Sequence, residues 1–264
     1  MIKQYKKDND KEEVINYIGK NYYKCLYLYL DLIEYRLDDN SVFCWGMYNE
    51  NNDLSLVMLN YHSALHIYSE TLDYNREELV NFIAKLDISI ICSREEIIND
   101  LAIYFPSFTP EIGVVSQLYE MEKYEDSEVV KATVDDLKEV TELIYIDEDS
   151  GASYDLSDLV SQMKERLYNS FSRAYIIKKD NHIVANIATG GETNSIATLT
   201  NLIVRKEYRR KGLAGRVFKK LCWELLSEGK EVYSIYYVPE SIALHNKMGF
   251  VTRCRYGKLF KRIH

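Results

Sequence analysis

Apolar positions in the second half of the chain recur with two spacings that predict alternating strands and helices. An apolar run predicts a strand over residues 196–204. Residues 214–227 follow with a helical pattern, and Gly229 stands after the last turn as a helix C-cap. The small and apolar positions of that helix lie three or four residues apart: Ala214, Val217, Phe218, Leu221, Cys222, Leu225 and Leu226. A strand, a short turn and a helix are therefore predicted in that order.

The elements around this unit predict an α/β protein with a mixed sheet and crossover helices. Thr133 is placed to cap a helix whose apolar positions are Leu137, Val140, Leu143 and Ile144. Turns are expected at Asp180-Asn181 and at Gly190-Gly191. The other predicted elements are a strand from 129, a helix over 155–169, strands over 174–178, 182–188 and 232–238, a helix over 241–247 and a strand pair within 251–260.

The first half of the chain has a similar order of elements. Helices are predicted over residues 11–28, 77–85 and 95–104, and strands over 41–48, 54–60, 64–69 and 88–92. The strongly polar segment 120–128 separates the halves, so we predict domains at 1–125 and 126–264. Residues 69–77 contain no glycine-rich turn on which a diphosphate could dock. An unrelated α+β domain is the alternative for the first half.

The predicted turn before helix 214–227 carries the strongest chemical signal. It consists of Arg209, Arg210, Lys211, Gly212, Leu213, Ala214 and Gly215, and it is called the glycine turn below. Its small residues let the backbone approach a ligand, and the first amides of a helix favour a phosphate group. A turn that merely ends a strand is the alternative interpretation.

Two motifs in this region resemble those of the GNAT superfamily of acyl-CoA-dependent N-acyltransferases. Arg209-x-x-Gly212-x-Ala214, preceded by Leu202 and Val204, is similar to the family's acyl-CoA signature. The segment 244–250, Leu-His-Asn-Lys-Met-Gly-Phe, is similar to the ending of its last helix. The resemblance covers roughly residues 129–264, and the first half is interpreted as a degenerate GNAT-like domain, a scaffold and one wall of the acceptor pocket. It implies a GNAT fold, acetyl-CoA as acyl donor and the primary amine of a small molecule or peptide as acceptor.

The resemblance also implies which residues meet the donor. Backbone N–H groups of Leu202, Ile203 and Val204 would contact the thioester and pantetheine, while the glycine turn would bind the diphosphate. His245 stands where the family has tyrosine, and Val238 where it usually has asparagine.

Two side chains are candidates for proton transfer. His245 would also contact the donor, and a histidine can protonate the departing thiolate near neutral pH, although a structural or solvent-facing histidine is the alternative. Glu192 is the first candidate for the general base, and water relays through Thr198 or Thr200 are the alternative.

Charge and composition narrow the classes of function. Residues 1–128 hold 11 Lys and Arg against 24 Asp and Glu, whereas residues 129–264 hold 22 against 17. The acidic half would repel nucleic acid, and no apolar run is long enough for a membrane span. The five scattered cysteines suggest neither a disulfide framework nor a metal site. We therefore expect a cytoplasmic enzyme without a metal, a nucleic-acid partner or a membrane partner.

One other class of function stays open at this stage. A non-catalytic acyl-CoA-binding or sensing module would also explain the two motifs and the missing tyrosine and asparagine. The acceptor and the oligomeric state also stay open, with a homodimer as one alternative.

Overall fold

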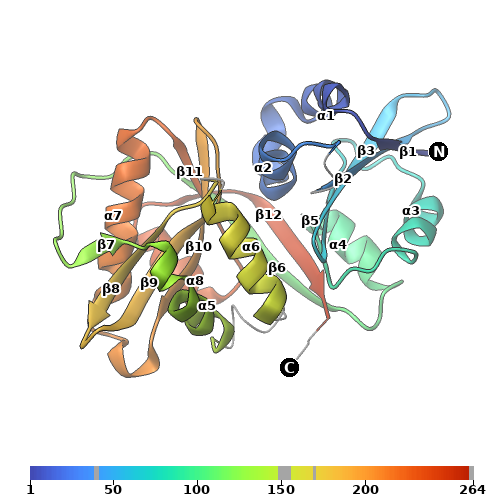
Figure 1. Ribbon diagram of the computed structural model, residues 1–264. Helices are drawn as coiled ribbons and strands as arrows, with labels where there is room; N and C mark the ends of the chain where they lie inside the picture. Colours follow the sequence, from blue (N-terminus) through green and yellow to red (C-terminus); the bar gives the residue numbers. More distant parts are fainter. Residues whose placement is uncertain (39–41, 148–155, 169–170, 262–264) are drawn as a thin grey trace. The chain divides into compact units, whose positions relative to one another are not determined.

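The computed structural model describes residues 1–38, 42–147, 156–168 and 171–261, and it divides into two compact units (Figure 1). The first unit combines Met1–Val115 with Arg253–Arg262, and the second spans Ser116–Thr252. The sequence-based boundary lay at 125/126 and left the last strand with the second half. In the structure most of that strand belongs to the first unit.

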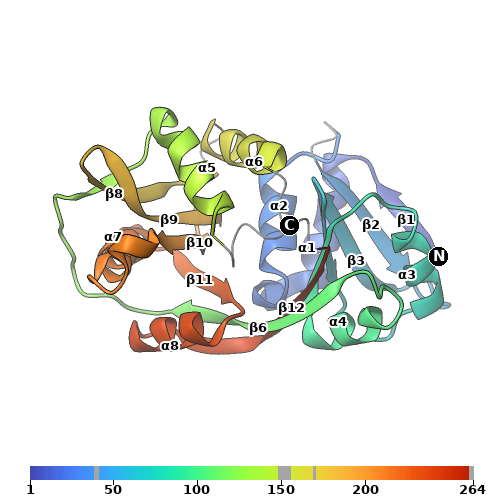
Figure 2. The same ribbon diagram turned by 90° about the horizontal axis from the view of Figure 1, so that it is seen from below.

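The second unit is a mixed sheet covered by helices on both faces. Its strands run in the order β6-β11-β10-β9-β8-β7, and β10 pairs antiparallel with β9 but parallel with β11. Figure 2 shows α7 on one face of β8, β9 and β10, and α5 and α6 on the other. The strands are β6 (Thr109–Leu118), of which only the end from Ser116 belongs to this unit, β7 (Val129–Lys131), β8 (Ala174–Lys179), β9 (His182–Glu192), β10 (Ile196–Val204) and β11 (Glu231–Tyr236). The helices are α5 (Leu137–Tyr145), α6 (Leu156–Tyr168), α7 (Leu213–Ser227) and α8 (Pro239–Lys247).

Side chains that alternate between the two faces of the strands form one core on each face of this sheet. Ile187 packs with Val217 and Leu221 of α7, whereas the next residue, Ala188, packs with Val140 of α5. Successive side chains of a strand point to opposite faces, so one strand serves both cores. The structure thus confirms the predicted mixed sheet with crossover helices.

The first unit is built on a mixed run of strands in the order β1-β2-β3-β4-β5-β12-β6, and β6 is common to both units. Residues Tyr256–Phe260 of β12 pair antiparallel with Ile90–Arg94 of β5, and Leu259 is fully buried among residues of this unit. The strands are β1 (Ile2–Tyr5), β2 (Phe43–Tyr48), β3 (Leu54–Tyr61), β4 (Ala64–Tyr68), β5 (Ile90–Arg94) and β12 (Val251–Phe260). The helices are α1 (Lys11–Ile18), α2 (Leu26–Glu34), α3 (Arg76–Ile83) and α4 (Glu95–Ala102).

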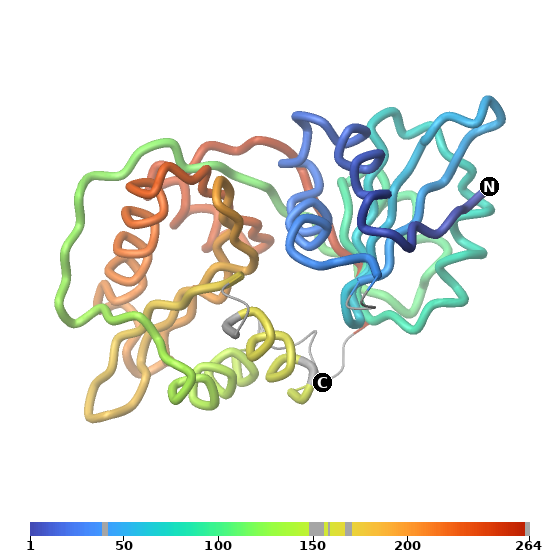
Figure 3. The backbone as a smooth tube through the Cα atoms, turned by 45° about the horizontal axis from the view of Figure 1, so that its top comes forward, coloured from blue at the N-terminus to red at the C-terminus, as the bar shows by residue number. Residues whose placement is uncertain are grey.

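Three local predictions were wrong. The helix predicted over residues 11–28 is broken at Gly19, whose φ of 53° ends α1, and Figure 3 shows two separate coils there. Gly190-Gly191 is not a turn, because β9 continues to Glu192 and the chain reverses where the Thr193 amide bonds to the Ile196 carbonyl. The predicted strand pair within 251–260 is the single strand β12.

The cysteines and the helices carry no sign of a disulfide or a membrane span. All five cysteines lie in the described residues as free thiols, and burial raises the pKa of Cys44 and Cys92 to about 12. No helix in the described ranges combines the length and the apolar character needed to cross a bilayer.

Candidate acyl-CoA site

The glycine turn opens α7 in a conformation that leaves its first amides without a side-chain cap. Gly212 is the N-cap, with φ 76° and ψ 2°, and no side chain caps the helix. The first intrahelical bond runs from the Arg216 amide to the Gly212 carbonyl at 3.3 Å, so the amides of residues 213–215 precede the ladder. A Cβ atom at Gly212 or at Gly215 would meet nothing within 4 Å. The backbone here is therefore accessible at the positive end of the helix dipole.

The basic side chains of the turn differ in how they are held. Arg209 is tied down: its Nε donates to the Val204 carbonyl at 3.0 Å, and its Nη2 lies 3.2 Å from Asp147. Lys211 covers the Tyr208 ring, with Nζ 4.8 Å from the centroid. Arg210 is exposed and has a φ of 61°, which is unusual for a residue with a side chain. The turn thus keeps positive charge beside the open amides.

Strands β10 and β11 separate at the end that leads into the glycine turn. Their parallel pairing runs from Ile196 opposite Glu231 to Leu199 opposite Ser234 and includes no later residue of β10. The part of β10 that follows Leu199 is called the divergence below. It contains Leu202, Ile203 and Val204, whose side chains pack into the two cores. Their backbone has no ladder partner on the β11 side.

His245 lies at the divergence, inside the α7 face of the sheet. It is 5% exposed, and its ring stacks on Tyr236 with centroids 4.1 Å apart. Its Nδ1 is 2.7 Å from the Ser241 carbonyl and its Nε2 is 3.1 Å from Ser234 Oγ. A carbonyl only accepts, so Nδ1 carries a proton. Burial lowers the pKa of His245 below its usual value, so Nε2 accepts from the Ser234 hydroxyl at neutral pH.

Glu192 lies at the other end of β10 from the divergence. It is opposite Ala197, near the start of the strand, and is 9% exposed. Its carboxylate accepts from Arg173 and lies 3.0 Å from Lys230 Nζ. The structure therefore does not bring Glu192 together with His245 and the glycine turn.

The two threonines proposed for a water relay differ in position. Thr198 is fully buried within the paired part of β10, and its hydroxyl donates to the Gly191 carbonyl at 3.4 Å. Thr200 is partly exposed and begins the divergence, with its hydroxyl 3.3 Å from Asn201 Oδ1. Of the two, Thr200 is better placed to hold a water near the donor.

The corresponding place in the first unit is occupied by its own groups. Strands β4 and β5 pair only from Ala64 to His66, and beyond this Arg94 Nη1 donates to the carbonyls of Ser69 and Glu70, both at 3.2 Å. The first turn of α3 contains Glu77 and Glu78, and the Asn75 side chain accepts from the Glu78 amide at 3.0 Å. A helix start that is capped and acidic does not favour an anion.

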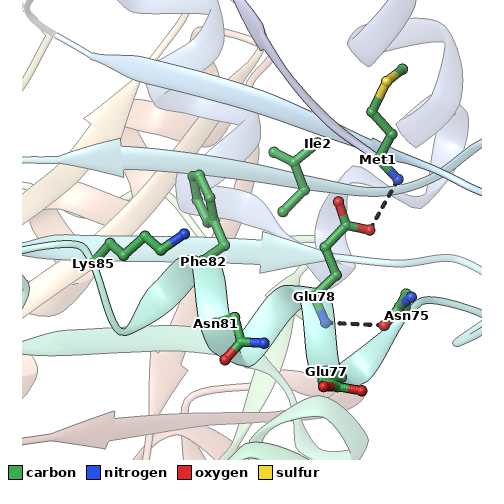
Figure 4. A pocket seen from close by; sticks show the side chains of 8 residues that line it. All are labelled: Met1, Ile2, Asn75, Glu77, Glu78, Asn81, Phe82 and Lys85. Carbon is green, nitrogen blue, oxygen red and sulfur yellow. Dashed lines mark hydrogen bonds and ion pairs between the residues drawn. The ribbon is translucent and has the colours of Figure 1, made fainter.

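A depression in the first unit lies on the α3 surface, and Asn75, Glu77 and Glu78 are part of its lining. Figure 4 shows its lining, which includes Ile2, Phe82 and Lys85, and its volume is about 570 Å³. Met1 and Glu78 form an ion pair of 2.9 Å across it. Within the described ranges, no group of three or more metal-ligating side chains is found.

Comparisons with known proteins find a family match within the second unit. Residues 170–252 match the family model described as acetyltransferase (GNAT) domain. This segment contains β8 to α8, the glycine turn and the divergence. No curated protein matches the chain.

Solved structures resemble the chain over nearly its whole length. A Drosophila protein aligns with a TM-score of 0.69, 12% identity and 98% coverage of each chain. A tandem GNAT protein from the clavulanic acid biosynthesis pathway aligns at 0.58, 11% and 98% of each chain. A GNAT-family acetyltransferase from Colwellia psychrerythraea aligns at 0.58, 12% and 99% of each chain. At these identities the likeness concerns the fold alone, and the family match is what names the domain. The chain therefore contains an acetyltransferase domain of the GNAT family, which spans residues 170–252.

Proposed function

We propose that this protein is an acetyl-CoA-dependent N-acetyltransferase that moves the acetyl group to a primary amine of a small molecule or peptide. The observation that carries the proposal is the glycine turn, because it combines a left-handed Gly212, open space at Gly215 and uncapped amides at the start of α7. These features suit a diphosphate. The GNAT domain match supports acyl transfer in general.

The divergence supplies the rest of the donor site in this proposal. The thioester would lie against the backbone of Leu202, Ile203 and Val204, where an N–H group can stabilise the charge that develops on the carbonyl oxygen. The amine attacks this carbonyl directly, and the C–S bond breaks as the new C–N bond forms. The CoA thiolate leaves and takes up one proton, while the amine loses one.

Each proton transfer has a candidate group. His245 is the proposed acid for the thiolate, because it lies within reach of Ser234, the last β11 residue that pairs with β10. For the amine's proton we propose a water held at Thr200, since Glu192 is engaged by Arg173 and Lys230 away from the divergence. Transfer through positioned groups typically raises rates by ~10²–10⁴-fold.

We further propose that the first unit has no CoA site. Arg94 fills the gap beyond β4 and β5, and Asn75 caps α3 beside two glutamates. One donor should therefore bind per chain. Calorimetry with acetyl-CoA on the full chain checks this number, and two bound molecules would contradict it.

Turnover separates the enzyme from a non-catalytic acyl-CoA-binding or sensing module. The neutral, buried His245 in place of a tyrosine is the feature that favours the module. A thiol-release assay over a panel of primary amines should give CoA release that depends on one class of amine. Tight acetyl-CoA binding with no release over the whole panel would favour the module instead.

A further inference from the structure

Strand β10 contains a bulge within the divergence. Thr200 pairs with Ala188 and Ile203 pairs with Asn186, so Asn201 and Leu202 together lie opposite the single residue Ile187. Asn201 has a φ of 53°. A bulge of two residues against one bends its strand and re-aims the backbone groups next to it. Here these are the groups of Leu202 and Ile203.

One side chain holds the bulge from the neighbouring strand. Asn186 Nδ2 donates to the Asn201 carbonyl at 2.8 Å, across fifteen residues of sequence. Asn186 is fully buried, and its strand partners Ile176 and Ile203 are apolar. This bond fixes the carbonyl of the one residue in β10 with a left-handed backbone.

Packing alone does not explain an amide at this position. Asn186 Oδ1 is buried, and no hydrogen-bond partner for it is found among the described residues. An unsatisfied buried acceptor costs stability, whereas an apolar side chain of similar volume would avoid that cost. What the amide supplies that an apolar group cannot is the donor to Asn201.

We propose that Asn186 is a positioning residue for the acyl donor. It holds the β10 bulge, so that the backbone of residues 202–204 stays turned to the side on which β10 and β11 separate. This inference rests on the proposed function for its ligand. Asn186 itself touches no substrate and acts through Asn201. Its loss should therefore weaken acetyl-CoA binding and slow turnover without removing a reacting group.

The test replaces Asn186 by leucine, which has a similar size and no donor. Asn186→Leu should raise the acetyl-CoA Kd about tenfold, a change typical of losing one backbone constraint. Thr141→Val is the matched control, because Thr141 is also buried and contacts Met163 at the core that contains Ile203, and its hydroxyl bonds to the Leu137 carbonyl within α5. The control should change thermal stability and leave the Kd unchanged. If Asn186→Leu does not fold, Asn186→Ser, whose side chain is too short for the bond, takes its place.

A second substitution tests the bulge itself. Glycine adopts a positive φ without a steric penalty, so Asn201→Gly should recover most of the affinity lost in Asn186→Leu. Parent affinity in Asn186→Leu, an equal loss in the Thr141→Val control, or no recovery with Asn201→Gly would each overturn the proposal.

Amide hydrogen exchange gives a readout without any ligand. In Asn186→Leu the amides of residues 200–204 should exchange faster, while those of β8 stay protected. Unchanged exchange at 200–204 would overturn the positioning role. If the parent binds no acetyl-CoA, the proposed function fails, and this measurement still decides the role of Asn186.

Discussion

At the scale of single residues, burial decides what His245 can do. Its ring lies between Tyr236, Phe218 and Phe250, and its two nitrogens have partners on Ser241 and Ser234. Desolvation disfavours the imidazolium, so the pKa lies below the usual value of 6.5. A group with this pKa can donate a proton where the pH lies below that pKa, and at neutral pH it is a hydrogen-bond acceptor.

The proposed acid role of His245 makes a prediction for the rate. The acid is competent only while protonated, so the rate should fall as pH rises through a pKa below 6.5. His245→Phe should keep the acetyl-CoA affinity and lower the rate by ~10²–10⁴-fold where chemistry is limiting. His245→Tyr should shift the fall to higher pH. Steady-state kinetics from pH 5 to 9 measure these changes, and an equal rate in His245→Phe would return the residue to a structural role.

The same lowered pKa predicts how folding stability depends on pH. Above 6.5 His245 is neutral in both states, and as pH falls below 6.5 the unfolded chain takes up a proton before the folded one does. The free energy of unfolding should therefore decrease with acidity, and His245→Phe should remove this part of the decrease. Urea unfolding at several pH values, followed by Trp223 fluorescence in a Trp45→Phe background, measures it. Identical pH dependence with and without His245 would contradict the lowered pKa.

At the scale of elements, the start of α7 combines two glycines with different roles. Gly212 needs its left-handed backbone, so any side chain there adds strain whether or not a ligand binds. Gly215 has an ordinary backbone with free space beside it. Substitutions at Gly215 can therefore probe the ligand separately from the fold.

Charge at Gly215 should control donor binding. Gly215→Glu should weaken acetyl-CoA binding at least ~10-fold, equivalent to about 1.4 kcal/mol. The reason is that its carboxylate would place a negative charge beside the proposed diphosphate site and repel the diphosphate. Gly215→Lys is the matched control of similar size and opposite charge, and it should lose much less affinity. Both should keep the parent melting temperature or exceed it, since glycine is the weaker helix former. Calorimetry that finds equal losses for the two variants would place the diphosphate elsewhere.

At the scale of the whole molecule, the last strand completes the first unit. The chain enters the second unit through β6 and returns through β12, whose residues from Arg253 onward count with the first. Leu259 is buried opposite Ile91, and Lys258 Nζ lies 2.9 Å from Glu111. A fragment that stops near residue 125 would therefore lack a strand of its own sheet.

A substitution near the C-terminal end should destabilise the first unit. Leu259→Ala should cost about 2–5 kcal/mol, the usual range for truncating a fully buried leucine. Val251→Ala on the same strand is the control, because Val251 is 53% exposed and should change stability by less than ~0.5 kcal/mol. Denaturation followed by Trp45 in a Trp223→Phe background reports on the first unit. A transition unchanged by Leu259→Ala would show that β12 contributes little to that unit.

The sequence by itself determined the features that depend on neighbouring residues. The helical spacing of apolar positions in residues 214–227 predicts the bounds of α7 to within one residue. Gly212 marks the turn before this helix, because a left-handed backbone is a requirement of that one residue and of no distant partner. The order of strands and helices also predicted the mixed sheet, and the resemblance of two motifs predicted the GNAT domain; the sheet and a GNAT domain at residues 170–252 are confirmed. The roles of the individual site residues stay predictions.

Only the tertiary structure decided the features that depend on residues far apart in the chain. The pairing of β12 with β5, the ion pairs of Glu192 with Arg173 and Lys230, and the bond from Asn186 to Asn201 all join separate segments. Local periodicity has no information about such partners, because the sequence pattern around a strand or a carboxylate is the same whichever distant residue it contacts. Burial of His245 among three aromatic rings likewise follows from how α7, α8 and β11 pack, and that packing sets its pKa.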